Sequence, residues 1–236
     1  MCGRYTNMMT WAEMMAILNA FLYGTGDEQV DRDIEWTGNV NIAPTTMVPA
    51  LRYVDGKGRI DLMRWGLVPA WSKEIGTYAT HNARSEEIAG KPAFRGAWKA
   101  GRRCVIPASS FFEWKKLDPA GKEKQPYAIG LGNKGPMAFA GVWEEWTPKD
   151  GTPPVLSCTI ITTGPNSLME PIHNRMPVIL GDEDVAKWLG KEAANSDEIA
   201  DLLRPFDAGR MAAWPVSKAV GNVKNKGREL IEPVSI

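Results

Sequence analysis

A cysteine stands at the second position of this 236-residue chain, in the stretch MCGRYTN. Aminopeptidases remove an initiator methionine that precedes a small side chain, and Cys2 would then carry a free α-amine beside its thiol. Such a 1,2-aminothiol adds to one aldehyde carbon twice, first as an imine and then as a five-membered thiazolidine. An α-amine has a pKa of about 8 and a free thiol about 8.5, so we expect both groups to be partly reactive at cellular pH. The alternative is that Cys2 is an ordinary small residue near a chain end.

Acid-base chemistry has three candidate side chains elsewhere in the sequence. Glu113 stands between Phe112 and Trp114 in SSFFEWKK, where neighbouring aromatics would raise its pKa and make it a general acid. Strand alternation offers another reading, in which Glu113 points to water and the aromatics point inward. The two histidines, His81 and His173, can each shuttle protons near neutral pH. With no third histidine and no nearby carboxylate cluster, the sequence predicts no metal site. We also expect no cofactor.

Composition limits the class of protein. The 28 basic and 28 acidic side chains cancel, but the stretch from Lys91 to Lys116 holds seven Lys or Arg against one acid, which can form a local basic face. Three cysteines without CxxC spacing argue against a disulfide framework, and Cys104 and Cys158 lie in apolar runs typical of a core. No signal region and no membrane-length apolar run is present. We therefore expect a cytoplasmic protein with no membrane association.

The elements that must position these residues are mostly strands. A capping box at Thr10 and Glu13, followed by apolar residues on one face, predicts a helix over residues 10–23. The turn sequence DGKG between two apolar runs predicts a hairpin over residues 47–69. Further strands are expected at 104–117, 125–132, 136–146 and 155–163, short helices at 184–189 and from 196, and edge strands at 212–225 and 229–236.

This order of elements predicts an α+β fold. We expect residues 1–236 to form a single β-rich domain, with a barrel-like and mostly antiparallel sheet core flanked by a few helices. The length suits one large domain, and no internal repeat or low-complexity tract interrupts it.

Taken together, the motifs resemble the SOS-response-associated peptidase (SRAP) family, whose members process abasic sites in single-stranded DNA. The resemblance runs through MCGRYTN, NIAPTT, MRWGLVPAW, NARSE, RRCVIPASSFFEWKK, ITT, HNRMPVIL and PVSKAVGNVKNKGRELIEPV, which is nearly the whole chain. It implies that Cys2 captures the sugar aldehyde of an abasic site as a thiazolidine, leaving a covalent DNA-protein crosslink. Asn82 would orient the adduct, Glu113 would protonate the sugar ring oxygen as it opens, and His173 would move protons in imine formation and ring closure.

The resemblance also implies a set of DNA-binding positions. Three arginines would hold phosphates near the lesion, two tryptophans would pack on bases or backbone, and two further residues lie in motifs that line the family's cleft. These positions are Arg4, Arg84 and Arg175, then Trp71 and Trp114, then Pro44 and Thr162. His81 receives no role from the motif.

The sequence therefore favours a monomeric abasic-site sensor that shields single-stranded DNA from strand scission, with lyase-type covalent chemistry and an associated peptidase activity that removes Met1. Two alternatives stay open. One is an N-terminal-nucleophile cysteine amidohydrolase or protease, in which the Cys2 α-amine serves as the base. The other is a non-covalent single-stranded DNA-binding module.

Overall fold

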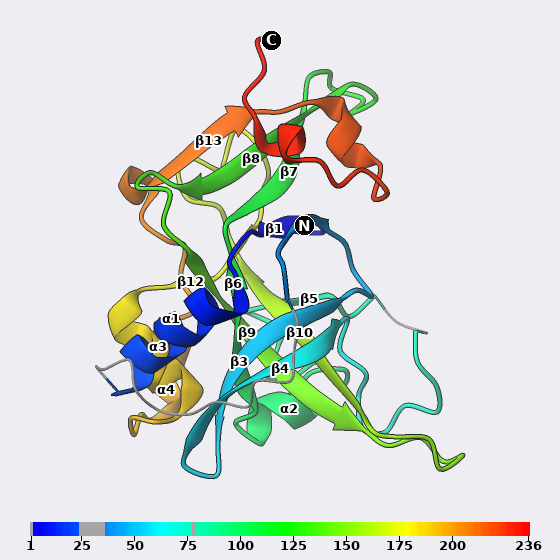
Figure 1. The fold of residues 1–236 in the computed structure, drawn as a ribbon, viewed down its shortest axis with the longest axis vertical. Coiled ribbons are helices and arrows are strands. Elements are labelled where there is room, and N and C mark those ends of the chain that lie inside the picture. Colours follow the sequence, from blue (N-terminus) through cyan, green and yellow to red (C-terminus); the bar gives the residue numbers. More distant parts are fainter. Residues whose placement is uncertain (1, 24–35, 77–78) are drawn as a thin grey trace.

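Five long strands close into a barrel in the computed structural model, which describes residues 2–23, 36–76 and 79–236 (Figure 1). They are β3 (Met47–Val54), β4 (Lys57–Trp65), β6 (Arg103–Ala108), β9 (Met137–Trp146) and β10 (Val155–Thr163). Neighbouring strands pair in the order β10-β4-β3-β6-β9, and β9 pairs with β10 again to complete the ring. Every pairing in the ring is antiparallel except β4 with β10. The expected α+β class with a barrel-like, mostly antiparallel core is confirmed.

Local sequence explains the hairpin that begins the barrel. Asp55 and Gly56 link β3 to β4, and both have positive φ angles, 53° and 76°. Two consecutive residues of positive φ match the twist of the flanking strands, and Asp-Gly adopts them readily. The hairpin predicted from DGKG is therefore confirmed.

The barrel strands have two apolar faces, because successive side chains in a strand point to opposite sides. One set packs together in the barrel interior: Val48, Ala50, Met63, Trp65, Cys104, Ile106, Phe139, Cys158 and Ile160. The alternate set forms the outer core under the helices: Leu51, Ile60, Val105, Ala140, Val142 and Ile161. Cys104 and Cys158 are fully buried core residues, as the sequence predicts.

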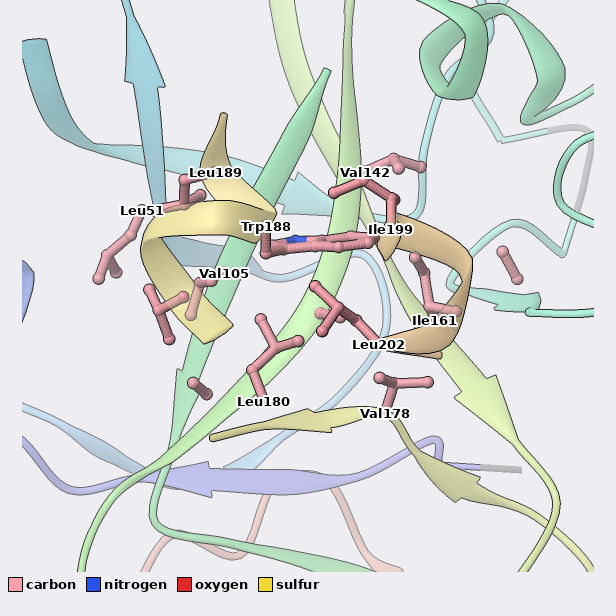
Figure 2. Close-up of a cluster of buried hydrophobic side chains, with 14 of the residues drawn as sticks. Leu51, Val105, Val142, Ile161, Val178, Leu180, Trp188, Leu189, Ile199 and Leu202 are labelled. Atoms are coloured by element: carbon pink, nitrogen blue, oxygen red, sulfur yellow. The ribbon is translucent and has the colours of Figure 1, made fainter. Parts of the chain in front are cut away.

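Helices cover the outer face of the barrel. They are α1 (Trp11–Tyr23), α2 (Arg95–Lys99), α3 (Asp182–Leu189) and α4 (Ser196–Asp201). Trp188 of α3 lies at the centre of the outer core, surrounded by Leu180, Val142 and Leu202 (Figure 2). Its indole N–H donates to the Cys104 carbonyl at 2.9 Å. In the ranges described, no helix is long and apolar enough to cross a membrane.

Caps fix where the predicted helices begin. At α1, the Thr10 N–H donates to Glu13 at 2.7 Å and the Glu13 N–H donates to the Thr10 hydroxyl at 3.2 Å, which is the predicted capping box. Asn195 makes the same motif with Glu198 at the start of α4. The helix expected at 184–189 begins two residues earlier, at Asp182.

Three short strands pair with barrel strands and extend the sheet of the barrel. Strand β5 (Asn82–Arg84) runs parallel to β10, while β11 (Met176–Pro177) and β12 (Ile179–Leu180) pair with β10 and β9.

A second sheet lies beside the barrel and has the strand order β13-β8-β7-β1-β2 (Figure 1). Its strands are β1 (Tyr5–Asn7), β2 (Asn39–Ile42), β7 (Ser110–Lys116), β8 (Lys124–Leu131) and β13 (Met211–Pro215). The strand predicted over 104–117 is wrong as one element, because β6 belongs to the barrel and β7 to the second sheet. The chain changes sheets at Ser109, whose N–H donates to the Thr6 carbonyl at 2.7 Å and whose hydroxyl accepts from the Met8 N–H at 2.9 Å.

The C-terminal segment corrects a second prediction. Only β13 and the isolated bridge between Val216 and Pro233 are extended in the region of the expected edge strands 212–225 and 229–236. The rest contains the 3₁₀ turns η2 (Lys218–Gly221) and η3 (Arg228–Ile231) joined by irregular segments, and a third such turn, η1 (Ala208–Arg210), precedes β13. Side-chain hydrogen bonds take the place of strand pairing here. The Asn41 side-chain amide of β2 donates to the backbone carbonyls of Val220, Asn222 and Asn225.

Candidate functional site

Cys2 lies at the junction of the two sheets, three residues before β1 begins, and is fully buried. Its carbonyl accepts a hydrogen bond from the Asn82 amide at 2.7 Å. Asn82 begins β5 and pairs with Ile160 of β10, so the barrel fixes its position. Its Oδ1 atom is buried and has no hydrogen-bond partner among the described residues. Met1, whose removal is expected from the sequence, lies outside the described part of the chain.

Glu113 comes to the same place from the second sheet. It is 3% exposed, so the reading in which it points to water is wrong. Phe111 and Glu113 share one face of β7, toward the barrel, while Phe112 and Trp114 pack on the opposite face. Burial raises the pKa of Glu113 to about 7, as expected for a carboxyl group without water to solvate its charge. The side chain is therefore partly protonated at neutral pH.

His173 faces Glu113 from the loop that enters β11, with its Nε2 atom 3.8 Å from Oε2 of the carboxyl group. Nδ1 lies 3.1 Å from the Arg175 backbone nitrogen and 3.2 Å from the Arg175 carbonyl oxygen, so the Arg175 backbone orients the ring with Nε2 toward Glu113. Burial lowers the pKa of His173, and the charges of Lys116 and Arg175 lower it further. At neutral pH the His173 imidazole is therefore uncharged.

These four residues, Cys2, Asn82, Glu113 and His173, are called the Cys2 cluster below. Burial raises the pKa of the Cys2 thiol, and the nearby Glu113 charge raises it further. The expectation of a partly ionised thiol is corrected: the sulfur is protonated in this environment. The cluster also contains carboxyl and imidazole groups suited to accept a proton from this thiol.

Arg175 and Thr162 lie beside the Cys2 cluster. The Arg175 guanidinium donates to the Thr162 carbonyl at 2.6 Å and forms a two-pronged ion pair with Glu86. Thr162 is fully buried and pairs with Arg84 across β10 and β5. Arg84 is exposed and pairs with Glu87 at 3.1 Å. The structure thus brings three of the expected DNA-binding residues together.

The other four expected DNA-binding residues lie apart from this group. Arg4 donates to Asn41 and to the carbonyls of Val220 and Gly221, at 2.8 to 3.1 Å. Pro44 is half-buried in the turn between β2 and β3, and Trp114 packs on the face of β7 opposite Glu113. Trp71 is 57% exposed, and its indole donates to the Pro92 carbonyl at 3.2 Å. Their contact with DNA stays a prediction.

Sequence reasoning missed the acidic residues Glu86 and Glu87. Both follow Arg84 within NARSEE, and that spacing of an arginine and two carboxylates was the available signal. His81, which received no role, packs edge-on against Trp65 at a centroid distance of 6.0 Å, and its carbonyl accepts from the Trp65 indole at 2.8 Å. Over the described residues, no three His, Cys, Asp or Glu side chains form a group that could hold a metal ion.

Comparisons with known proteins agree with this arrangement. Residues 1–223 match the family described as SOS response associated peptidase (SRAP). Abasic site processing protein YoqW of Bacillus subtilis (strain 168) is 41% identical over 234 residues, covering 98% of this chain and 99% of that protein. Abasic site processing protein YedK of Escherichia coli (strain K12) is 31% identical, covering 99% of this chain and 100% of its own length. A crystal structure of a Bacteroides thetaiotaomicron protein superposes with a TM-score of 0.83 at 26% identity, over 99% of this chain and 100% of that one.

Proposed function

Because this chain belongs to the SOS response associated peptidase family, we propose that it captures abasic sites in single-stranded DNA as a covalent thiazolidine on Cys2. The relatives YoqW and YedK, both named abasic site processing proteins, support a DNA lesion as the substrate. The observation that carries the proposal is the Cys2 cluster, which gathers a buried thiol, a carboxamide, a carboxyl group of raised pKa and a neutral imidazole around the start of β1.

The proposed reaction begins after Met1 has been removed. The Cys2 amine adds to C1′ of the open abasic sugar, and loss of one water gives an imine. The Cys2 sulfur then bonds to C1′ while its proton moves to the nitrogen, which completes the thiazolidine. The carbonyl character of C1′ is lost in this product, so β-elimination and strand scission no longer have their driving force.

Proton transfer assigns a role to each neighbour. Glu113, with a pKa near 7, donates its proton to the sugar ring oxygen as the ring opens and then accepts the proton that the Cys2 thiol must release. His173 directs its Nε2 atom toward Glu113 and moves protons with it during imine formation and ring closure. Asn82 already donates to the Cys2 carbonyl, and its free Oδ1 accepts from the attacking amine. The three groups thus supply the acid, the proton carrier and the orienting contact.

In this proposal Arg175, Arg84 and Thr162 bind the DNA beside the Cys2 cluster. The DNA on either side of the lesion is contacted by the remaining expected residues, Arg4, Pro44, Trp71 and Trp114. The protein acts as a cytoplasmic monomer without a cofactor. Net neutrality of the chain fits a protein that depends on covalent capture more than on bulk charge attraction. Release of Met1 is the peptidase reaction that the family name suggests, and the chain either catalyses it or receives it from a general aminopeptidase.

Intact mass spectrometry after incubation with a single-stranded abasic oligonucleotide tests the proposal. The expected spectrum lacks the mass of Met1 and gains the mass of the oligonucleotide minus one water. Cys2→Ala should give no adduct, whereas Cys104→Ala, which removes another fully buried thiol, should keep it. Circular dichroism of both variants verifies that they fold.

An adduct on the Cys2→Ala protein would show that the aminothiol mechanism is wrong. Turnover of peptide or amide substrates without DNA would point to an N-terminal-nucleophile hydrolase. Salt-reversible binding that ignores abasic sites and survives Cys2→Ala would point to a non-covalent binding module.

A further inference from the structure

The guanidinium of Arg175 is already occupied by an acid. Its Nη1 atom donates to Oε1 of Glu86 and Nη2 donates to Oε2 at 2.9 Å, which is the bidentate geometry in which an arginine also binds a phosphate. The bond to Arg175 lowers the pKa of Glu86 to about 2. Glu86 therefore carries its negative charge at every physiological pH.

The two members of this pair differ in freedom to move. The Arg175 side chain is 13% exposed, whereas that of Glu86 is 54% exposed. Glu86 lies in the turn after β5, where its carboxylate also accepts a hydrogen bond from the Ser85 hydroxyl at 2.9 Å. Glu86 can thus swing into solvent while Arg175 stays in place.

Arg175 does not depend on Glu86 for its position. Nη2 donates to the Thr162 carbonyl at 2.6 Å, and the backbone N–H is held by His173. Within the described ranges its Nε atom is buried without a hydrogen-bond partner, so the guanidinium retains an unused donor. These contacts hold a cation at the edge of the Cys2 cluster whether or not the acid is present.

The neighbouring pair is weaker. Glu87 contacts Arg84 at 3.1 Å and Lys91 at 3.4 Å, but all three side chains are 41% to 54% exposed. Ion pairs between such exposed groups contribute little, because water and salt screen them. Of Glu86 and Glu87, only Glu86 is paired with a largely buried cation, Arg175, and would compete there with an anionic ligand.

We propose that Glu86 is a specificity-determining residue, a phosphate surrogate that occupies Arg175 until a DNA phosphate displaces it. This inference rests on the proposed function, in which Arg175 binds DNA. Breaking the ion pair between Glu86 and Arg175 offsets part of the free energy gained when a phosphate binds Arg175, and this holds for any DNA strand. At an abasic site the covalent bond to Cys2 retains the DNA, whereas an undamaged strand has no such bond and dissociates. Glu86 therefore reduces occupancy of undamaged single strands without preventing capture of the lesion.

Fluorescence anisotropy with an undamaged oligo-thymidine strand, over a range of salt concentrations, tests the inference. Glu86→Gln should bind about fivefold more tightly than the unsubstituted protein at low salt, the order expected for removing one partly exposed competing ion pair. The slope of log K against log salt should change little, because the bound state of both proteins has the same contact between Arg175 and a phosphate. Glu145→Gln is the matched control, since it removes an exposed carboxylate of β9 outside this cluster and should change binding far less.

Unchanged or weaker binding by Glu86→Gln overturns the inference. A purely structural role for Glu86 would instead slow adduct formation without tightening the binding of undamaged DNA, and that result overturns it too. The proposed function is tested separately, by the adduct of the unsubstituted protein with abasic DNA. Adduct formation together with unaltered Glu86→Gln binding refutes only the role of Glu86, whereas absence of the adduct refutes the proposed function.

Discussion

Replacement of Glu113 by glutamine should raise the free energy of unfolding, relative to that of the unsubstituted protein, more at alkaline pH than at acidic pH. The side chain is buried, and its pKa rises from the ordinary 4.5 to about 7 on folding. A raised pKa means that the folded state binds the proton more tightly than the unfolded state. The stabilisation is therefore complete below about pH 4.5 and is lost as the pH rises through 7. Each pKa unit corresponds to about 1.4 kcal/mol, so the loss is about 3 kcal/mol.

Glutamine has nearly the shape of glutamate and never ionises, so the variant escapes this loss. Urea unfolding of both proteins from pH 4 to pH 8.5 gives the difference in their free energies of unfolding at each pH, and contributions from other groups cancel. The difference should shift by about 3 kcal/mol in favour of Glu113→Gln, with most of the change between pH 5 and 7.5. A difference that stays flat across this range would mean that the Glu113 carboxylate is fully compensated in the folded protein, and the reasoning from burial would fail.

The same substitution should slow crosslinking to abasic DNA by a factor of about 100 or more, the usual contribution of a general acid. Higher stability with lower activity is the pattern expected where a functional site stores an unfavourable charge. A Glu113→Gln protein that crosslinks at the unsubstituted rate would remove Glu113 from the mechanism.

Two further substitutions examine the barrel interior. Tyr5→Phe should raise the free energy of unfolding by about 1 kcal/mol in urea titrations, because the Tyr5 hydroxyl is buried with no hydrogen-bond partner in the described chain. The variant keeps the ring contacts with Trp65 and Phe139. A clear loss of stability would show that the hydroxyl is hydrogen-bonded. Gly141→Ala should lower the free energy of unfolding by about 3 kcal/mol, because a Cβ atom there would lie 2.3 Å from the Ile106 side chain and 2.6 Å from the Thr159 carbonyl oxygen. Gly164→Ala, with no atom within 4 Å of its new Cβ, is the control, and equal unfolding midpoints for the two variants would contradict the packing argument.

Local patterns predicted the elements whose ends are determined by nearby residues. The capping box at Thr10 and the Asp55-Gly56 turn both lie where the sequence indicates, because each depends on hydrogen bonds or dihedral angles within a few residues. The change of sheet at Ser109 could not be predicted in this way. It depends on a hydrogen bond to Thr6, more than a hundred positions away, while the surrounding sequence continues as an unbroken strand-like run.

The candidate site shows the same division. Residue types and motifs were enough to select the members of the Cys2 cluster, but alternation along β7 could not decide whether Glu113 faces water. Both faces of β7 are covered, one by the barrel and the other by the C-terminal turns, so Phe111 and Phe112 are both buried. The ion pair of Glu86 with Arg175 joins segments 89 positions apart and likewise needed the folded chain.

The parallel pairing of β4 with β10 has a consequence for the order of folding. Two parallel strands cannot be joined by a tight turn, and here the segments that meet are separated by more than ninety residues, so closing the barrel is a non-local and slow step. Strand β10 also holds β5, and β5 supplies the Asn82 amide that grips Cys2. Before β10 docks, Cys2 lacks this contact, and a thiol that solvent reaches is open to oxidation and mixed-disulfide formation. Closure of the barrel is therefore the folding step that completes the burial of Cys2, and a chain arrested before it leaves this thiol unprotected.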